Sequence, residues 1–174
     1  MGGLRFAILT ASNRAAAGIY EDRSGQVLQE TLKQLLDEVE IRAYRVLPDD
    51  RAAIAEQLRT WADSDEIDII LTTGGTGFSP LDVTPEATRD VIEREAPGLA
   101  EAMRAASSAI SPHGMLSRAV CGIRGKTLIV NLPGSPKGAV ENLRVILPAL
   151  PHAVALLRSD PNAEAGHAHP LRVA

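Results

Sequence analysis

Apolar residues in this chain occur in two alternating patterns. Residues 4–9 and 67–73 are nearly continuous apolar runs, which are typical of strands buried on both faces of a sheet. Residues 24–37 and 51–63 instead repeat apolar side chains every three or four positions, which predicts helices with one buried face. Because strands and helices alternate, the sequence favours a three-layer α/β fold with a mostly parallel central sheet.

The other segments extend this plan. Residues 41–47 alternate in polarity and end at Pro48, which suits a strand near a sheet edge. Residues 117–123 and 126–132 flank a tight Arg124-Gly125 turn, so they are expected to pair and could make the sheet mixed.

Helix starts are predicted at three prolines. A helix from Thr84 to about residue 94 is expected, with Thr84 as N-cap and Pro85 in the first turn. Another begins at Pro97, and a third at Ser135-Pro136. Pro148 and Pro151 interrupt the last pattern, so a kink or a new helix should follow there.

Composition narrows the class of protein. The 174 residues suit a single domain, expected over residues 1–160, with a flexible tail at 161–174. A net charge of −4 argues against a broad nucleic-acid footprint. No apolar run reaches the roughly 18 residues of a membrane span. A single cysteine, Cys121, fits a reducing compartment and predicts a cytoplasmic protein.

The stretch LTTGGTGFSPLDVTPEA, residues 71–87, is the strongest candidate for a binding site. Gly74, Gly75 and Gly77 follow an apolar run, and backbone N–H groups in such a loop can cradle an anion. Thr76 adds a hydroxyl, and the following helix start favours negative charge. The loop matches neither a Walker A motif nor G-x-G-x-x-G, so a long strand-to-helix turn is the alternative interpretation.

A second loop, NLPGSPKG, places Lys137 in the first turn of a helix. A cation there opposes the helix dipole, and an anionic ligand would reverse that cost. The alternative is an exposed lysine whose charge lies in solvent. Ser12 follows the first strand, and Ser117 and Arg118 begin the later strand pair. An arginine can clamp a phosphate with two hydrogen bonds, but each of these residues could equally be an ordinary surface residue.

Two acids complete the candidate site. Asp49 and Asp82 should lie at the carboxyl edge of the sheet, although either Asp49 or Asp50 could instead cap the helix from Arg51. Carboxylates beside phosphates require a cation between them, and Mg²⁺ binds through one or two carboxylates, phosphate oxygens and water. The pattern therefore indicates a metal-bridged nucleotide. No Ser/His/Asp or Cys/His arrangement is readable, and Cys121 is expected to be an inert core thiol.

The motifs together resemble one family. SNRAAAGIYEDRSG, VLPDD, TTGGTG, DVTPEAT and SRAVCGIRGKTLIVNLPGSPKGAVENL occur in the order found in the MoaB and Mog proteins of molybdenum cofactor biosynthesis, which share a domain with gephyrin. The resemblance covers residues 4–158. It implies Mg²⁺-dependent transfer of AMP from ATP to molybdopterin, in a homotrimer that passes its product to a separate metal-insertion protein.

The resemblance also implies roles for individual residues. The two essential catalytic acids, which would also be the Mg²⁺ ligands, fall on Asp49 and Asp82. Nucleotide and phosphate contacts fall on Ser12, Gly74, Gly75, Thr76 and Gly77, and molybdopterin contacts on Ser117, Arg118, Pro133, Gly134, Ser135 and Lys137. The early motif often reads Ser-Asp in the family, whereas this chain has Asn13, so a charge-dependent role at that position is in question.

Two other functions are compatible with the same motifs. The chain could hold the pterin without turning it over, as a carrier. It could also hydrolyse nucleotide pyrophosphates like the CinA proteins, which usually carry a second domain. Asp49 and Asp82 favour an active enzyme over a carrier.

Overall fold

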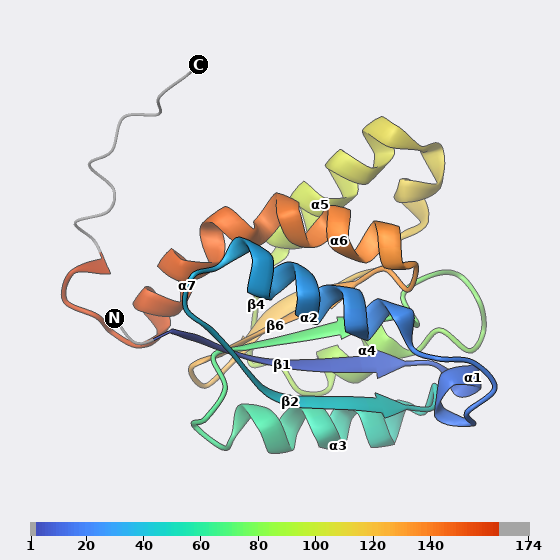
Figure 1. Ribbon diagram of the computed structural model, residues 1–174, viewed down its shortest axis with the longest axis horizontal. Coiled ribbons are helices and arrows are strands. Elements are labelled where there is room, and N and C mark those ends of the chain that lie inside the picture. The colour runs from blue at the N-terminus through green and yellow to red at the C-terminus, as the bar shows by residue number, and fades with distance from the viewer. Residues whose placement is uncertain (1–2, 164–174) are drawn as a thin grey trace.

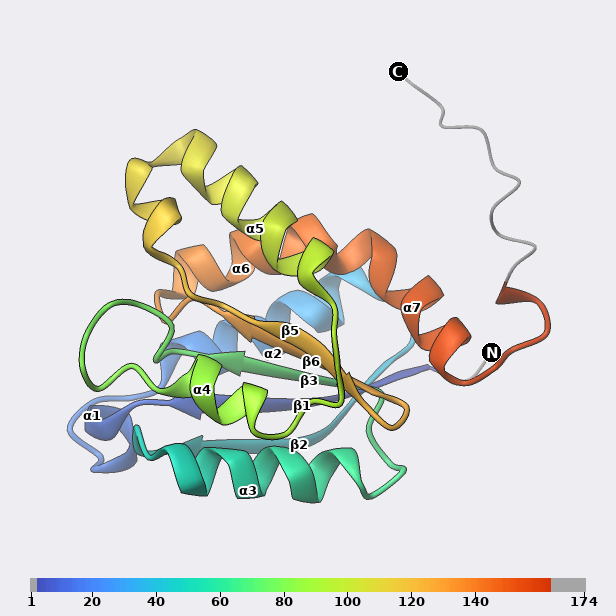
Figure 2. The same ribbon diagram turned by 180° about the vertical axis from the view of Figure 1, so that it is seen from behind.

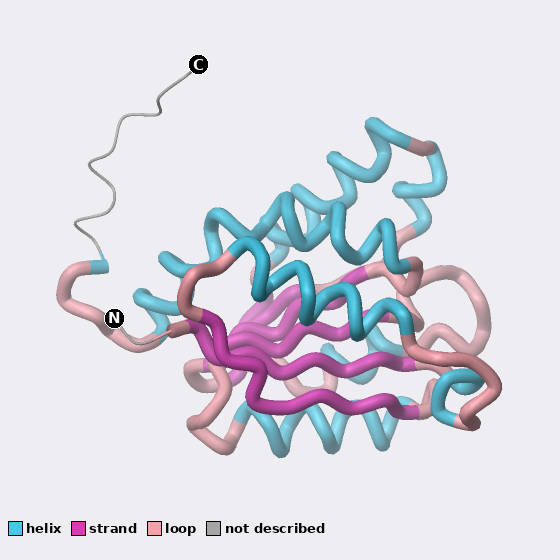
Figure 3. Tube along the Cα trace, viewed as in Figure 1, coloured by secondary structure: helices cyan, strands magenta, loops and turns pink. Residues whose placement is uncertain are grey.

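The computed structural model describes residues 3–163, whose helices and strands are drawn in Figures 1 and 3. The part of the expected tail beyond Ala163 lies outside the described residues, as do His167 and His169. The elements in chain order are β1 (Leu4–Ala11), α1 (Asn13–Ala16), α2 (Arg23–Leu35), β2 (Val39–Leu47), α3 (Arg51–Ala62), β3 (Ile69–Thr73), α4 (Thr84–Arg89), β4 (Arg94–Glu95), α5 (Pro97–Ile110), η1 (Pro112–Leu116), β5 (Cys121–Arg124), β6 (Thr127–Leu132), α6 (Pro136–Ile146), η2 (Leu147–Ala149) and α7 (Leu150–Leu157).

The strands form one six-stranded mixed sheet in the order β2-β1-β3-β6-β5-β4. The pairs β1–β2, β1–β3 and β3–β6 are parallel, whereas β5 runs antiparallel to both β6 and β4. The predicted hairpin of β5 and β6 and the edge position of β2 are therefore confirmed.

Helices cover both faces of the sheet, as the front and back views show (Figures 1 and 2). Phe6 and Ile8 of β1 face a core built with α2, α5, α6 and α7. Ala7 and Leu9 of the same strand face a second core built with α3 and α4. Alternate residues of one strand thus contribute to two cores, which explains why consecutive positions from Phe6 to Leu9 are all apolar. The predicted three-layer α/β architecture is confirmed.

Two local predictions were wrong. Thr84 is the first residue of α4 rather than its N-cap, because Val83 occupies that position without a side-chain cap. The helix ends at Arg89 rather than near residue 94. Beyond it, the Glu93 amide donates to the Ile123 carbonyl at 2.8 Å and the chain pairs with β5 as the short strand β4. Strand pairing distant in sequence overrides the local helical pattern.

The last helical segment, 22 residues from Pro136 to Leu157, is by length and hydropathy alone sufficient to cross a membrane. In this structure its apolar side chains pack inside the protein, because Leu143, Leu150 and Val154 belong to the core under α6 and α7. The predicted interruption at Pro148 is confirmed as η2. This segment is therefore a core element of the α/β layer.

The strand order places a topological switch point between β1 and β3. From β1 the chain proceeds to β2 on one side, and β3 then lies on the other side of β1. Loops leaving the carboxyl ends of β1 and β3 therefore diverge, which opens a crevice where ligands bind in sheets of this kind.

Candidate functional site

A cavity of about 630 Å³ occupies this crevice. It gathers segments that are far apart in sequence, from the ends of β1, β2, β3 and β6 and the start of α2. Of the residues predicted as site residues, the structure brings together here Ser12, Asp49, Gly74, Gly75, Asp82 and Gly134. Both predicted acids thus share one cavity with the glycine-rich loop.

Gly74 and Gly75 are required by the backbone of this loop. Their φ angles are +95° and +64°, a region that L residues rarely adopt. A Cβ on Gly74 would lie 2.3 Å from the Ala11 carbonyl oxygen, and a Cβ on Gly75 would lie 2.4 Å from Thr84 Oγ1. The glycines therefore allow the loop after β3 to pass directly against the end of β1.

Hydrogen bonds join the loops around the cavity. Thr73 Oγ1 donates to the Pro133 carbonyl at 2.7 Å, and Ser24 Oγ donates to the Gly134 carbonyl at 2.6 Å. Ser135 caps α6 as predicted, because its Oγ accepts from the Gly138 amide at 3.1 Å. The cavity wall is therefore a fixed arrangement, suited to holding two reactants in one geometry.

The structure distinguishes the two acids of the LPDD segment. Asp50 caps α3, since its Oδ1 accepts from the Ala53 amide at 2.8 Å. Asp49 is half-buried and lines the cavity, and its Oδ1 would lie 3.3 Å from a Cβ placed on Gly75. Of the two acids, Asp49 is therefore the one that faces this cavity.

Asp82 lies on the other side of the same loop. Its Oδ2 accepts from the Ser79 amide at 3.0 Å and would lie 2.9 Å from a Cβ on Gly77. Within residues 3–163, no lysine or arginine pairs with Asp49 or Asp82. Two carboxylates without a cation thus flank the glycine-rich loop.

Arg118 supports this loop from behind. Its Nε donates to the Gly77 carbonyl at 2.7 Å, and its Nη2 donates to the Asp82 carbonyl at 2.7 Å. Its Nη1 pairs with Glu86 at 2.5 Å, which holds the pKa of that carboxyl below its ordinary value. Because the guanidinium is already engaged, Arg118 fixes the backbone around Asp82, and its predicted contact with molybdopterin stays a prediction.

A second, smaller cavity of about 320 Å³ adjoins the other side of the loop. Five of the predicted site residues line it: Thr76, Gly77, Ser117, Pro133 and Ser135. The glycine-rich loop and the loop after β6 each contribute to both cavities. The structure thus offers two neighbouring compartments with a shared wall.

Lys137 lines neither cavity. Its side chain is 81% exposed, and its Nζ lies 3.8 Å from Glu141 Oε1, one helical turn along α6. This position matches the alternative interpretation of a lysine whose charge lies in solvent. The side chain is long and exposed, so its ammonium group is free to adopt other positions. Its predicted role toward a phosphate stays a prediction.

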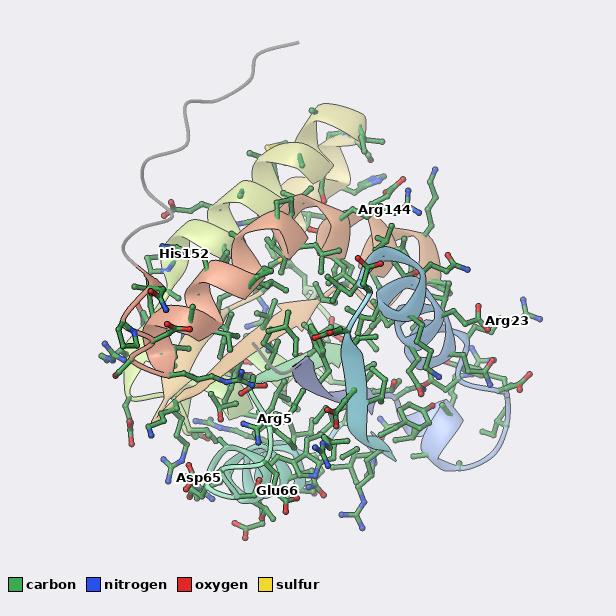
Figure 4. All side chains as sticks on the ribbon, turned by 60° about the vertical axis from the view of Figure 1, so that its left-hand side comes forward. Arg5, Arg23, Asp65, Glu66, Arg144 and His152 are labelled. Carbon is green, nitrogen blue, oxygen red and sulfur yellow. The ribbon has the colours of Figure 1, made fainter. Side chains whose placement is uncertain are left out.

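The motif SNRAAAGIYEDRSG was recognised in the sequence, but Ser12 alone was assigned a site role from it. The structure adds five residues that line the larger cavity around the start of α2: Tyr20, Glu21, Asp22, Arg23 and Ser24. Asp22 caps this helix, since its Oδ1 accepts from the Gly25 amide at 3.0 Å. An Asp two residues before a Ser-Gly pair at a helix start is a capping signal that could have indicated this segment. Arg23 extends outward from the beginning of α2 (Figure 4).

Asp22 is buried and fully engaged. Thr10 Oγ1 and the Tyr44 hydroxyl each donate to its Oδ2 at 2.5 Å. Burial, and then the hydrogen bond to this carboxylate, raise the pKa of Tyr44. Because the three side chains join α2 to β1 and β2, Asp22 holds the helix N-terminus at the cavity.

The oxygen atoms at this cavity fit the requirements of Mg²⁺. In the described part of the chain, no three His, Cys, Asp or Glu side chains cluster to hold a metal ion. Asp49 and Asp82 nevertheless offer carboxylate oxygens without a cationic partner, and the buried Thr84 Oγ1 beside Gly75 has no hydrogen-bond partner. Two carboxylates that line one cavity suit Mg²⁺, which keeps water and phosphate oxygens as further ligands.

Cys121 has no part in this site. It is buried in β5, and burial raises the pKa of its thiol to about 12. A protonated thiol is a poor nucleophile, so the expectation of an inert core cysteine is confirmed.

Comparison with known proteins gives a consistent result. Residues 7–152 match the family described as "Probable molybdopterin binding domain". A protein of Helicobacter pylori strain J99 named molybdopterin adenylyltransferase is 42% identical over 158 residues, which cover 90% of this chain and 89% of that protein. Gephyrin of Dictyostelium discoideum is 43% identical over 170 residues, or 93% of this chain, but the chain spans only 24% of that longer protein.

Solved structures agree with the sequence matches. The molybdopterin biosynthesis enzyme MoaB of Thermus thermophilus is 47% identical with a TM-score of 0.84, covering 91% of this chain and 98% of that one. A CinA protein of Thermoplasma acidophilum, covering 85% and 98% of the two chains, has a TM-score of 0.62 at 16% identity, so the likeness extends to the fold alone.

Proposed function

The chain belongs to the MoaB/Mog family of molybdenum cofactor biosynthesis proteins, and on that basis we propose that it is a molybdopterin adenylyltransferase. Such an enzyme transfers AMP from ATP to the terminal phosphate of molybdopterin and releases pyrophosphate. The observation that carries the proposal is that Asp49, Asp82 and the glycine-rich loop line one cavity with a second compartment beside it. A reaction that joins two anionic substrates requires such a pair of sites.

The larger cavity is assigned to the triphosphate. Gly74 and Gly75 leave no side chains on that wall, so phosphate oxygens can approach the backbone closely. The N-terminus of α2 also faces this cavity and favours an anion. The smaller compartment, with Ser117, Pro133 and Ser135, is assigned to molybdopterin.

The chemistry needs no nucleophile from the protein. An oxygen of the pterin phosphate attacks the α-phosphorus of ATP, the bond from that phosphorus to the bridging oxygen of the β-phosphate breaks, and pyrophosphate leaves with both bonding electrons. The task of the protein is to place the two phosphates in line and to stabilise charge. Arg118 contributes indirectly, because it fixes the backbone at Gly77 and Asp82.

A magnesium ion would be held by Asp49 and Asp82 together with phosphate oxygens. When bound, it supplies positive charge that offsets the triphosphate and the pyrophosphate leaving group. Among residues 3–163, four acids line the cavity together with one arginine, Arg23: Glu21, Asp22, Asp49 and Asp82. An ATP molecule without a divalent cation would therefore be repelled from this site.

The deciding experiment is incubation of the protein with molybdopterin, ATP and Mg²⁺, followed by mass analysis for adenylated pterin and assay of pyrophosphate. Adenylated pterin is expected only when all three are present. Pterin binding without metal-dependent ATP binding would instead indicate a carrier. Release of phosphate products from ADP-ribose would indicate a CinA-like hydrolase.

The cellular context follows from the same assignment. We propose a cytoplasmic homotrimer that delivers its product to a separate metal-insertion protein. The buried, unreactive Cys121 is compatible with a reducing compartment. Light scattering of the purified chain tests the trimer directly.

A further inference from the structure

Asn13 and Asp49 form a reciprocal pair of hydrogen bonds. The Asn13 backbone amide donates to Asp49 Oδ2 at 3.0 Å, and the Asp49 backbone amide donates to Asn13 Oδ1 at 3.0 Å. The two residues are 36 positions apart and follow the ends of β1 and β2. This closed ring joins the two loops at the edge of the larger cavity.

The ring determines where the Asp49 carboxylate points. Its Oδ2 is occupied by the Asn13 amide, while its Oδ1 lies toward Gly75. Asp50 next to it is committed to capping α3 and cannot share this task. The pair therefore leaves one oxygen of Asp49 for a ligand and fixes its direction.

The local backbone explains why the side chain of Asn13 is needed. The β1–β2 ladder ends with the Ser12 amide donating to the Leu47 carbonyl at 2.9 Å. Pro48 has no N–H group, so the next donor along the chain is the amide of Asp49. In residues 3–163 the acceptor for that amide is the Asn13 side chain. Without it, the loop at Asp49 would lose its connection to the end of β1.

We propose that Asn13 is a positioning residue that acts through Asp49. Its side-chain oxygen holds the backbone at Asp49, so that the carboxylate stays against Gly75, where the nucleotide is expected. The inference rests on the proposed function in one respect, namely that Asp49 contacts the metal-bound triphosphate. An aspartate at position 13 would keep an acceptor oxygen in the same place, whereas an alanine would remove it.

A double-mutant cycle tests this inference, with calorimetry of MgATP as the readout. Asn13→Ala is expected to weaken MgATP binding about 10-fold when Asp49 is present, which corresponds to the loss of one well-placed interaction. In an Asp49→Ala background the same change is expected to alter binding less than about 2-fold. Equal effects in both backgrounds would show that Asn13 does not act through Asp49.

Three further measurements separate positioning from a general loss of stability. Asn13→Asp is expected to retain kcat within a few-fold, whereas Asn13→Ala lowers it about 10-fold or more. Asp50→Ala, which removes the cap of α3, should lower the Tm without changing MgATP affinity. Asn13→Ala should leave molybdopterin binding unchanged. Loss of pterin and MgATP binding in parallel would overturn the inference.

Failure of the proposed function gives a different result. If the unmodified protein does not bind MgATP at all, both the nucleotide assignment and the role of Asn13 fall. If it binds MgATP and the cycle is additive, the role of Asn13 alone falls.

Discussion

At the amino end of the sheet Asp68 is paired with two arginines, whereas at the carboxyl end Asp49 and Asp82 have backbone amides as partners. Asp68 accepts from Arg5 Nη2 at 2.8 Å and from Arg158 Nε at 2.9 Å, and its side chain is 3% exposed. Figure 4 shows Arg5 beside Asp65, whose carbonyl accepts from Arg5 Nη1 at 2.9 Å. The negative charge of Asp68 is thus neutralised within the chain.

The contrast teaches how the same residue type serves stability at one end and binding at the other. Burial alone would raise the pKa of Asp68, but hydrogen bonds from Arg5 and Arg158 hold that pKa below its ordinary value. Asp49 and Asp82 are half-buried beside a cavity. Within residues 3–163, no lysine or arginine forms an ion pair with either of them. A charge that the fold leaves unbalanced is one that a ligand can balance.

The largest expected effect is at the carboxyl end. Asp82→Asn should reduce adenylated pterin formation by about 1000-fold, because it removes a charge that acts on the reacting phosphates. The Tm should change little, since the amide can still accept from the Ser79 backbone N–H. Asp63→Asn is the matched control, because this exposed acid pairs with Arg124 away from the cavity. Unchanged turnover in Asp82→Asn would remove Asp82 from the mechanism.

The opposite result is expected at the amino end. Asp68→Asn should lower the free energy of unfolding by about 3 kcal/mol, because it breaks a buried ion pair and leaves two arginines uncompensated. Both arginines are partly exposed and can regain water, which keeps the loss from being larger. Turnover at 25 °C should be retained. If Asp68→Asn keeps its stability but loses activity, Asp68 serves the reaction rather than the fold, and the contrast with Asp49 and Asp82 is wrong.

The ion pairs of Asp68 also predict how the free energy of unfolding should change with pH. The folded-state pKa of Asp68 is lowered, so its stabilising effect is complete above the unfolded pKa of about 3.9 and disappears as the pH falls through the folded value. The stability difference between the unmodified chain and Asp68→Asn should therefore be constant near pH 7 and shrink below about pH 4. Urea denaturation at several pH values measures it, and a difference that grows in acid would contradict the assignment.

Sequence patterns predicted what depends on near neighbours in the chain. The buried strands follow from continuous apolar runs, and Ser135 as N-cap follows from its position before Pro136. The pattern could not decide between Asp49 and Asp50, because both precede the same helix. That choice depends on Asn13, which is brought to Asp49 only when β1 and β2 pair.

Pairing distant in sequence explains the other differences as well. The strand β4 exists because its residues meet β5, and a local helical pattern carries no information about that partner. The charge of Arg118 left open whether it contacts a phosphate or lies at the surface, and it gave no sign that the guanidinium donates to two carbonyls and to Glu86 across the loop. Asp49 and Asp82 were expected at the carboxyl edge of the sheet from the strands that they follow, and both do line one cavity there.

A smaller effect is expected from the backbone of the glycine-rich loop. Gly74→Ala should cost about 2 kcal/mol of stability, because the residue has φ +95° and its Cβ would lie 2.3 Å from the Ala11 carbonyl oxygen. Gly125→Ala is a matched control, since Gly125 also has positive φ but no atom within 4 Å of its Cβ position. That control should cost about 1 kcal/mol. Equal costs in urea denaturation would show that the close approach to β1 has no energetic weight.

The smallest expected effect concerns Lys137. This residue has a partner within the chain, as Asp68 does, but the contact is exposed and can be exchanged for a ligand. Its exposed contact with Glu141 joins residues one helical turn apart. Lys137→Ala should therefore change the free energy of unfolding by less than about 0.5 kcal/mol. If its long stem moves the ammonium group onto the pterin phosphate, the same change should raise the KM for molybdopterin several-fold and leave the affinity for MgATP unchanged. Lys126→Ala is the control for general charge, because Lys126 lies in the turn between β5 and β6, at the amino end. Equal KM values for the two variants would show that Lys137 does not contact molybdopterin and that its charge lies in solvent.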